Sequence, residues 1–471
     1  MSAALPHALR VLADQPTRVW LVGGAVRDRL LGRETLDYDL AIEGDAQPLA
    51  RALGRAADGH AFLLSEEFGA WRVKGRSEPW QVDITPLAGD SIEQDLRRRD
   101  LTINAIATRL EAGAELLDPC GGAVDIEAGR LRAVGERSFS DDPLRVLRLA
   151  RFAAELGFAA DSRTEALAAA SASQLPAVAG ERVFQELRAL VCARHVLAGL
   201  ELASRIGAGA AVLPELEALR GVGQSDYHHL DVYDHTLATL GEVIALEAAP
   251  GTVFEADAAQ LRAILDEPLA NELTRGQALR FGALLHDIAK PLVRAVGEQG
   301  RVTFHDHDRI GAQMCATILQ RLRASDRLIE HVAALTRHHL RLGFLVHEQP
   351  LARRSVYRYM STCSPVEVDV SVLSVADRLA TLGRNSERAV AAHLALAREL
   401  MPDAITFRAR PPRPPLRGDQ LARALGIEPG PLLGQLLAEL TEASFAGELQ
   451  TSEQAVEHAR AQLARLGGGD G

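Results

Sequence analysis

The hydrophobic pattern in the first quarter of the chain is that of short strands. Between about residues 18 and 125, β-rich runs at 18–22, 38–42, 70–74 and 81–84 are separated by helical stretches and by turns that contain glycine. Short strands interspersed with helices in this way are typical of a small α/β domain.

The pattern then becomes helical and stays so. Apolar residues recur every three or four positions in 141–158 and 181–190, which predicts an all-helical middle region. The stretch 216–400 keeps the helical pattern but is richer in His and Asp, so we treat it as a separate domain. Segment 407–418, FRARPPRPPLRG, is too rich in proline for a helix and predicts an extended linker before a last helical module.

A chain of 471 residues is too long for one hydrophobic core and should divide into several domains. We therefore predict the α+β class. The predicted parts are a small mixed α/β domain at 1–125, a helical neck and body at 126–215, a helical domain at 216–400, and a linker with a helical C-terminal module at 401–471.

The composition predicts a cytoplasmic protein. The N-terminus lacks the apolar run of a signal peptide, and no segment offers about 18 consecutive apolar residues, so we expect no membrane partner. The four cysteines lack the CxxC spacing of a zinc site. A net charge of -11 argues mildly against a protein that coats nucleic acid, although a local basic stripe is enough to bind RNA.

Two neighbouring features indicate phosphate and metal chemistry. Gly23 and Gly24 follow a strand-like run and precede a helical one, which places bare backbone N–H groups where a phosphate can approach closely. Asp37 and Asp39 alternate along the next strand, so their carboxylates project from one face. Such a pair suits Mg²⁺, which would bridge a triphosphate and activate an attacking hydroxyl. Asp83, in the later run QVDIT, is a candidate third carboxylate.

These residues resemble the polymerase-β superfamily of nucleotidyltransferases, whose pattern is a double glycine followed by a strand with two spaced acids. The longer segments GGAVRD at 23–28, RRRDLTINA at 97–105 and DPLRVLRLARF at 142–152 resemble the bacterial tRNA CCA-adding enzymes and poly(A) polymerases. The resemblance is clear over 18–215 and looser beyond. It implies that the α/β domain is an Mg²⁺-dependent palm that extends tRNA 3′ ends from CTP and ATP.

The resemblance also implies which side chains hold the nucleotide. In the family the RRD segment handles ribose and phosphates, since a carboxylate can accept from a ribose hydroxyl and arginines bind phosphate oxygens bidentately. The nucleotide-binding residues expected here are Gly23, Gly24, Arg27, Arg98, Arg99, Asp100, Asn104, Asp142, Arg145, Arg148 and Arg182.

One helical turn is expected to read the base. Ser140 would cap the helix that follows it. By resemblance to the family, Asp142 would accept from the amino group shared by cytosine and adenine, and Arg145 would donate to ring acceptors, which disfavours uracil and guanine without a nucleic-acid template. Relatives usually carry Glu where this chain has Asp141. Arg182 would either contact phosphates or form a structural salt bridge.

The interval 84–96 bears on how many nucleotides are added. Full CCA-adding relatives carry a flexible loop between the QVDIT strand and the RRRD segment that helps to switch specificity from C to A, and this chain has little room for it. CC-adding relatives lack the loop. Addition of CC alone and addition of CCA by a diverged loop both stay open.

A second set of metal-ligating residue types lies in 216–400: His235, the adjacent His286 and Asp287, and the distant Asp377. Their order resembles the ligand order of the HD phosphohydrolase superfamily, which implies that these four are the metal ligands. The resemblance implies a site for Mn²⁺, Fe²⁺ or Ni²⁺, whose bound water would attack a phosphoester. Lys290 could steady a phosphate, and His307 with His338 or His339 would enlarge the site.

We predict tRNA, CTP and ATP as partners and do not expect DNA. The C-terminal module resembles the tail of the same family, which implies contact with tRNA, although its kinks are equally consistent with plain turns between helices. Three alternatives stay open: a poly(A) polymerase on general RNA, an HD phosphohydrolase with a vestigial palm, and a non-catalytic RNA-binding scaffold.

Overall fold

The structure is a computed structural model that describes residues 9, 12, 17–76, 79–111, 113–224, 229–348, 350–381 and 386–467. The chain forms two compact units, Met1–Val212 and Leu213–Gly471. The expectation that the chain lacks a signal peptide concerns the N-terminal segment, and most of this segment lies outside the described residues. The same is true of most of the glycine-rich tail.

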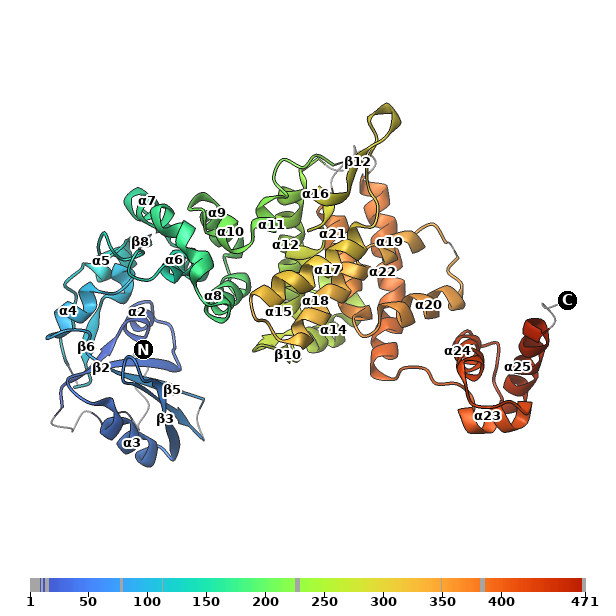
Figure 1. Ribbon diagram of the computed structural model, residues 1–471, viewed down its shortest axis with the longest axis horizontal. Coiled ribbons are helices and arrows are strands. Elements are labelled where there is room, and N and C mark those ends of the chain that lie inside the picture. The colour runs from blue at the N-terminus through green and yellow to red at the C-terminus, as the bar shows by residue number, and fades with distance from the viewer. Residues whose placement is uncertain are drawn as a thin grey trace. The chain divides into compact units, whose positions relative to one another are not determined.

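Unit 1 begins with a seven-stranded mixed sheet in the order β3-β4-β5-β2-β1-β6-β7 (Figure 1). β2 and β5 run parallel, and the other neighbouring strands are antiparallel. The strands are β1 (Val19–Val22), β2 (Asp37–Ile42), β3 (Gly59–Ser65), β4 (Ala70–Gly75), β5 (Gln81–Pro86), β6 (Ala107–Arg109) and β7 (Leu116–Leu117). A separate short parallel pair joins β8 (Arg130–Leu131) and β9 (Ala159–Ala160).

The helices of unit 1 include two that pack against the large sheet, α2 and α3, and a series that follows the sheet in the chain. They are α2 (Gly24–Leu30), α3 (Ala46–Ala56), α4 (Ile92–Arg97), η2 (Thr102–Asn104), α5 (Gly122–Glu127), α6 (Leu144–Leu156), α7 (Ser162–Ser171), η3 (Ala172–Ala177), α8 (Gly180–Cys192), α9 (Val196–Arg205) and α10 (Ala208–Val212).

The alternation of residues in β2 separates a covered face from a functional face. Tyr38, Leu40 and Ile42 are buried, whereas Asp37 and Asp39 are exposed. Helix α3 packs against β3, β4 and β5, and its start is fixed by the Asp45 carboxylate, which accepts from Gln47 N–H. The two carboxylates of β2 therefore project from the face that the buried side chains leave free.

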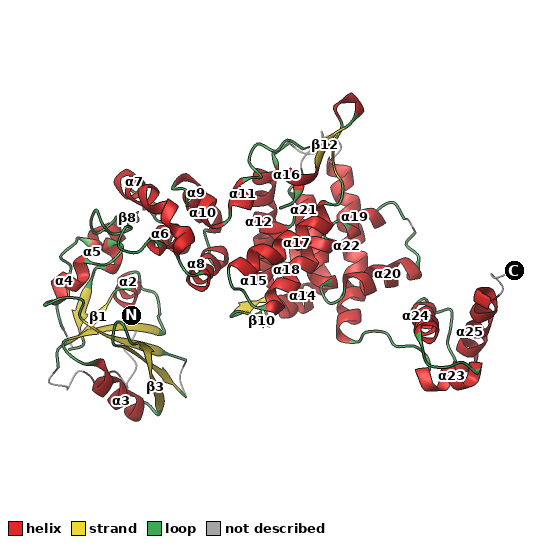
Figure 2. Cartoon of the chain, viewed as in Figure 1, coloured by secondary structure: helices red, strands yellow, loops and turns green. Residues whose placement is uncertain are grey.

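Unit 2 is almost entirely helical, apart from short strand pairs (Figure 2). Its core is built by the packing of α12, α15, α17, α18 and α21. The helices from 213 to 409 are α11 (Pro214–Glu217), α12 (Val232–Ala248), α13 (Gly251–Phe254), η4 (Glu255–Asp257), α14 (Ala258–Leu265), α15 (Arg275–Leu285), α16 (Lys290–Val293), η5 (Glu298–Gly300), α17 (His307–Arg321), α18 (Asp326–His338), α19 (Arg341–Leu345), α20 (Arg353–Cys363), α21 (Glu367–Leu379) and α22 (Ser386–Ala409). The strand pairs are β10 (Pro268–Ala270) with β11 (Leu273–Thr274), and β12 (Arg294–Val296) with β13 (Val302–Phe304).

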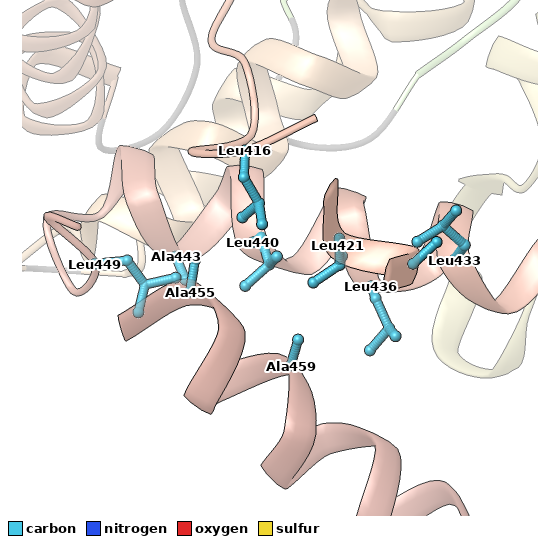
Figure 3. Close-up of a cluster of buried hydrophobic side chains, with 10 residues drawn as sticks. Leu416, Leu421, Leu433, Leu436, Leu440, Ala443, Leu449, Ala455 and Ala459 are labelled. Atoms are coloured by element: carbon cyan, nitrogen blue, oxygen red, sulfur yellow. The ribbon is translucent and has the colours of Figure 1, made fainter. Parts of the chain in front are cut away.

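The C-terminal module has a hydrophobic cluster of its own. Helices α23 (Gly418–Leu425), α24 (Pro431–Phe445) and α25 (Ser452–Gly467) pack around Leu421, Leu436 and Leu440 (Figure 3). Helix α20 packs against α24, where Arg354 forms ion pairs with three glutamates, Glu439, Glu442 and Glu448.

The α+β class is confirmed, and the four predicted strand runs correspond to β1, β2, β4 and β5. The linker prediction was wrong at its start, because α22 continues to Ala409 and so also crosses the boundary expected at residue 400. The buried ring of Phe407 packs against the rings of Tyr357 and Phe445, which also contact each other. This packing holds the last turn of the helix in place before Pro411.

Among the described residues, no single helix is long and apolar enough to cross a membrane. One bent pair, Val232–Ala248 with Gly251–Leu265 at 76°, meets the criteria of length and composition only.

Candidate functional site

A cleft of about 1050 Å³ in unit 1 is lined by the double glycine, all three predicted carboxylates and most of the predicted nucleotide-binding residues. In the sheet, Asp39 lies opposite both Val22 at the end of β1 and Asp83 on β5. Gly23 follows Val22 with a φ of 65°, and a Cβ there would lie 2.7 Å from Arg99 Nη1 and 3.8 Å from Asp39 Oδ2. The turn therefore needs glycine for its conformation and for the space beside the carboxylate.

Negative charge is concentrated at the floor of this cleft. Desolvation raises the pKa of Asp39, and Asp83 and Asp37 raise it further, while Arg99 opposes them. A cation placed between the carboxylates would relieve this repulsion. Hard oxygen ligands that share one face are the donors Mg²⁺ prefers, so the residues present fit this ion.

Asp83 has a partner that the sequence did not reveal. Arg72, opposite it on β4, donates from Nε to Oδ1 and from Nη2 to Oδ2, both at 2.7 Å. This bond to Asp83, more than the opposing effect of burial, raises the pKa of Arg72. The expected third carboxylate thus lies beside Asp39 but is held by a bidentate ion pair.

The RRD segment supplies a buried hydrogen-bonded network. Asp100 Oδ1 accepts from Leu101 N–H at 2.8 Å and from Asn104 Nδ2 at 3.0 Å, and its Oδ2 accepts from Arg148 Nε at 2.9 Å. Burial alone would raise the pKa of Asp100, but Arg148 and these hydrogen bonds hold it below its usual range. Arg27 Nη1 donates to Asn104 Oδ1 at 2.8 Å. The segment reaches the cleft as a fixed, ionised unit.

Arg148 extends this network to the neck helices. Its Nη1 donates to Glu186 Oε1 at 3.2 Å, and Arg151 Nε donates to Glu186 Oε2 at 2.6 Å. The guanidinium carbons of Arg148, Arg151 and Arg27 lie 5.3, 4.0 and 5.2 Å from the centre of the Phe152 ring. The ring and Glu186 together fix the basic side of the cleft.

The expected base-reading turn lies at the mouth of the same cleft, with a different cap. Ser140 donates to Arg137 O instead of capping, and α6 begins at Leu144, whose N–H donates to Asp142 Oδ1 at 3.2 Å. The N-cap position itself is taken by Pro143, and the Asp142 carboxylate before it accepts from the first N–H of the helix. Arg145 Nη1 donates to the Ser138 carbonyl oxygen at 3.0 Å.

Arg182 forms the salt bridge that was one of its two expected roles. Its Nη2 donates to Asp142 Oδ2 at 2.9 Å, and both side chains line the cleft. Arg98 differs from the other nucleotide-binding candidates: it is exposed at the C-cap of α4 and does not line the cleft.

Sequence reasoning missed Arg72, Phe152 and Glu186. Arg72 becomes visible only through strand register, which the sequence does not specify. Glu186 lies one helical turn after Arg182, and this spacing on α8 could have revealed it.

The four expected HD ligands meet in unit 2. His235 Nε2 lies 2.9 Å from Asp377 Oδ1 and 3.9 Å from Asp287 Oδ2, and His286 Nε2 lies 3.1 Å from Asp287 Oδ2. His235, His286 and Asp287 form one group with metal-ligand spacing. Burial would raise the pKa of Asp287, but His286 and Lys290 hold it well below its usual range, so it is an ionised carboxylate.

A second group shares Asp287. Its Oδ1 lies 3.4 Å from His307 Nε2 and 3.8 Å from His339 Nε2, and the three residues again have metal-ligand spacing. His339 is thus the member of the His338–His339 pair that enters the site. The ring of His338 instead accepts from Arg341 Nε at 2.9 Å.

The histidine rings are oriented by backbone carbonyls. The Nδ1 atoms of His286, His307 and His339 lie 2.7–2.8 Å from the carbonyls of Ala283, Phe304 and Thr336. Protonation at Nδ1 leaves each Nε2 free to ligate. His286 Nε2 is buried without a hydrogen bond of good geometry among the described residues, which is the arrangement a metal ion would satisfy.

Lys290 lies beside both groups. Its Nζ is 2.6 Å from Asp287 Oδ2 and donates to Gln224 Oε1 at 2.7 Å. Lys290, Asp287, His307, His339 and Asp377 line a pocket of about 640 Å³. A phosphoryl group in this pocket would meet the second ligand group, Asp377 and an ammonium.

The fold and the two sites define a nucleotidyltransferase with an HD domain. The poly A polymerase head domain model matches residues 19–132, the HD domain model matches 232–382, and the model described as the probable RNA and SrmB-binding site of polymerase A matches 157–219.

Curated relatives carry this further. The chain is 36% identical over 446 residues to the A-adding tRNA nucleotidyltransferase of Deinococcus radiodurans, covering 93% of this chain and 94% of that protein. It is 33% identical over 446 residues to the CC-adding tRNA nucleotidyltransferase of Thermus thermophilus, covering 93% and 92%. The chain belongs to the bacterial tRNA nucleotidyltransferase family. A structure of a CCA-adding enzyme with CTP has the same fold, with a TM-score of 0.63, 21% identity and coverage of 98% of this chain and 96% of that one.

Proposed function

We propose that unit 1 catalyses template-independent addition of C, A or both to the 3′ end of tRNA, using CTP and ATP and releasing pyrophosphate. The observation that carries the proposal is that the Asp37–Asp39 pair and the Asp142–Arg145 turn line one cleft. The names of the relatives, which act on tRNA, and the CTP in the related structure support the choice of substrates. We keep the cytoplasm as the expected location.

Asp37 and Asp39 would hold Mg²⁺. The ion would supply charge neutralisation of the triphosphate and activation of the attacking hydroxyl. Asp83 is left out of this set because both its oxygens accept from Arg72.

The remaining residues bind and orient. Gly23 lets a phosphate approach the start of α2, and Arg99 places a guanidinium beside it. Asp142 and Arg145 would discriminate by hydrogen bonds to the base, since cytosine and adenine share a donor–acceptor pattern that uracil and guanine reverse. The tRNA 3′-oxygen then bonds to the α-phosphorus of the nucleotide as the bond from that phosphorus to the pyrophosphate oxygen breaks.

The number of nucleotides added follows from a simple incorporation assay. Purified protein would be given tRNA ending before CCA, or tRNA ending in CC, with each NTP alone and with CTP and ATP together, and the ends would be sequenced. Two cytidines only indicate CC addition, one adenosine on the CC end indicates A addition, all three indicate CCA addition, and long adenosine tracts indicate a poly(A) polymerase. Absence of any C or A incorporation would overturn the proposal, and Asp39→Asn is the matched inactive control.

The short connection between β5 and α4, residues 87–91, gives little space for a specificity-switching loop at this point. That favours addition of a single kind of nucleotide. The two relatives named above carry out different partial additions, so the assay decides between C and A.

We propose a second activity for unit 2, the hydrolysis of a phosphoester at the HD site. The two ligand groups that share Asp287 favour it. Imidazole and carboxylate ligands suit Mn²⁺, Fe²⁺ or Ni²⁺. Two quantities would be compared between the unchanged protein and Asp287→Asn: the metal content after dialysis, and the rate of hydrolysis of bis(p-nitrophenyl) phosphate. Equal metal content in the two proteins would refute the site.

A further inference from the structure

The RRD segment and Arg72 lie on opposite sides of β2 in the sheet. In the sheet order, β1 and β6 flank β2 on one side, and β5, β4 and β3 flank it on the other. Arg99, Asp100 and Asn104 come from the segment that leads into β6. Arg72 comes from β4, on the far side of Asp39.

Among the described residues that line the cleft, Arg72 is the one cationic side chain that comes from β3, β4 or β5. The other lining arginines come from α2, α6 and α8 and from the segment after α4. Leu64 and Gln81 line the cleft on the same side as Arg72. This side therefore offers the Arg72 guanidinium with its partner Asp83, one apolar side chain and one amide.

The geometry of the Arg72–Asp83 pair leaves Arg72 able to bind a second anion. The two bonds to Asp83 use two of the five N–H donors of the guanidinium. The side chain keeps 26% of its surface exposed. A guanidinium held along one edge by a carboxylate still presents its other edge, and that edge suits a phosphate.

We infer that Arg72 binds the phosphate of the 3′-terminal nucleotide of the RNA, and that Asp83 is a positioning residue for Arg72. The inference rests on the proposed nucleotidyl transfer. An RNA end that delivers its hydroxyl to Asp39 has to enter from the side that the incoming nucleotide does not occupy, and its last phosphodiester needs a cation there. Leu64 and Gln81 would contact the terminal nucleoside.

The direct test is a chemical double-mutant cycle on binding, without NTP or metal. Two tRNAs would be compared, one natural and one with a neutral methylphosphonate at the last linkage. We expect the unchanged protein to bind the modified tRNA about tenfold more weakly, and Arg72→Ala to bind both equally. Moving the methylphosphonate to a linkage in the anticodon stem should remove the effect. Equal loss in both proteins would overturn the inference.

Salt dependence gives an independent readout. One lost phosphate contact to a single-stranded end should lower the slope of log K against log salt by about 0.7 in Arg72→Ala. Arg109→Ala is the matched control, because Arg109 lies on the same sheet and pairs with Glu111 at 2.7 Å, outside the cleft. Arg72→Lys, which keeps the charge without the fork, should restore the slope but only part of the affinity. An unchanged slope in Arg72→Ala would refute the contact.

Asp83→Asn separates positioning from metal binding. We expect it to raise KM for tRNA by a larger factor than KM for the nucleotide. Mn²⁺ binding at the palm, followed by electron paramagnetic resonance in an Asp287→Asn background, should persist. Loss of Mn²⁺ binding with an unchanged tRNA KM would make Asp83 a metal ligand and overturn its assignment.

The two proposals can fail separately. If the unchanged protein adds no nucleotide, nucleotidyl transfer fails, but the binding cycle still reports on Arg72. If nucleotides are added and the cycle shows no coupling, only the assignment of Arg72 fails.

Discussion

Replacing Asp142 by Asn separates its structural role from its proposed role in reading the base. Asp142 accepts from Leu144 N–H and from Arg182. Asn keeps an oxygen for the first bond, and Asn is as good a cap as Asp. The pair with Arg182 joins side chains that are 29% and 55% exposed, and exposed ion pairs contribute about 1 kcal/mol or less. The free energy of unfolding should therefore change by no more than about 1 kcal/mol.

The effect on selection should be larger. A hydrogen bond from the base amino group to a carboxylate contributes about 1.5–3 kcal/mol, or about 10- to 150-fold. The amide of Asn can also donate a hydrogen bond, so it can pair with the acceptor groups that uracil and guanine present and that a carboxylate would repel. We expect Asp142→Asn to lose about 10- to 150-fold of its preference for CTP or ATP over UTP and GTP.

The assay is single-turnover incorporation of each NTP, together with urea unfolding. Asp142→Ala is the companion variant, and it should lose about 1 kcal/mol more stability than the Asn variant because the cap is gone. If Asp142→Asn keeps its selectivity while remaining folded, Asp142 does not read the base.

Three further predictions concern stability. Gly122→Ala should lower the free energy of unfolding by about 1–3 kcal/mol in urea and should lower kcat/KM. The reason is that its Cβ would lie 2.1 Å from Thr102 O and displace the segment next to Asp100. Wild-type stability together with wild-type kcat/KM would contradict the close approach. Burial lowers the pKa of His393 to about 4, so between about pH 6.5 and pH 4 the unfolded chain binds more protons than the folded one. The free energy of unfolding should therefore fall as pH drops through this window, by up to about 1.4 kcal/mol per pH unit. His393→Gln should remove this part of the slope, and an identical slope in both proteins would count against the prediction. Leu440→Ala, at a fully buried position, should destabilise the C-terminal module by about 2–5 kcal/mol, and an unshifted thermal transition of that module would show that the cluster in Figure 3 is not its core.

Sequence patterns predicted those parts of the site that lie close together in the chain. The Gly23–Gly24 turn, the Asp37–Asp39 pair and the RRD segment are each local, and the structure brings their glycines and acids into one cleft. The order of the HD ligands was equally informative, since His235, His286, Asp287 and Asp377 meet as the resemblance implied.

What sequence could not predict depends on register and packing. Arg72 opposes Asp83 only because β4 pairs with β5 in a particular register. The choice of His339 over His338 depends on the rotation of α18 about its axis, which places one ring in the site and the other beside Arg341. The end of α22 depends on aromatic contacts made by Phe407, which outweigh the nearby prolines.

The ion pair of Asp100 and Arg148 limits how unit 1 can move during a reaction cycle. It ties the RRD segment to α6, and because Asp100 is buried, separating the two side chains would leave a buried carboxylate without its cation. The RRD segment and the turn proposed to read the base, at the start of α6, are therefore expected to move together. A change of preference between cytosine and adenine has to come from rotamer changes of exposed side chains such as Arg182, which take picoseconds to nanoseconds. The choice between CTP and ATP would then depend on how many nucleotides of the RNA end already lie in the cleft. It would not require a slower hinge motion between parts of unit 1.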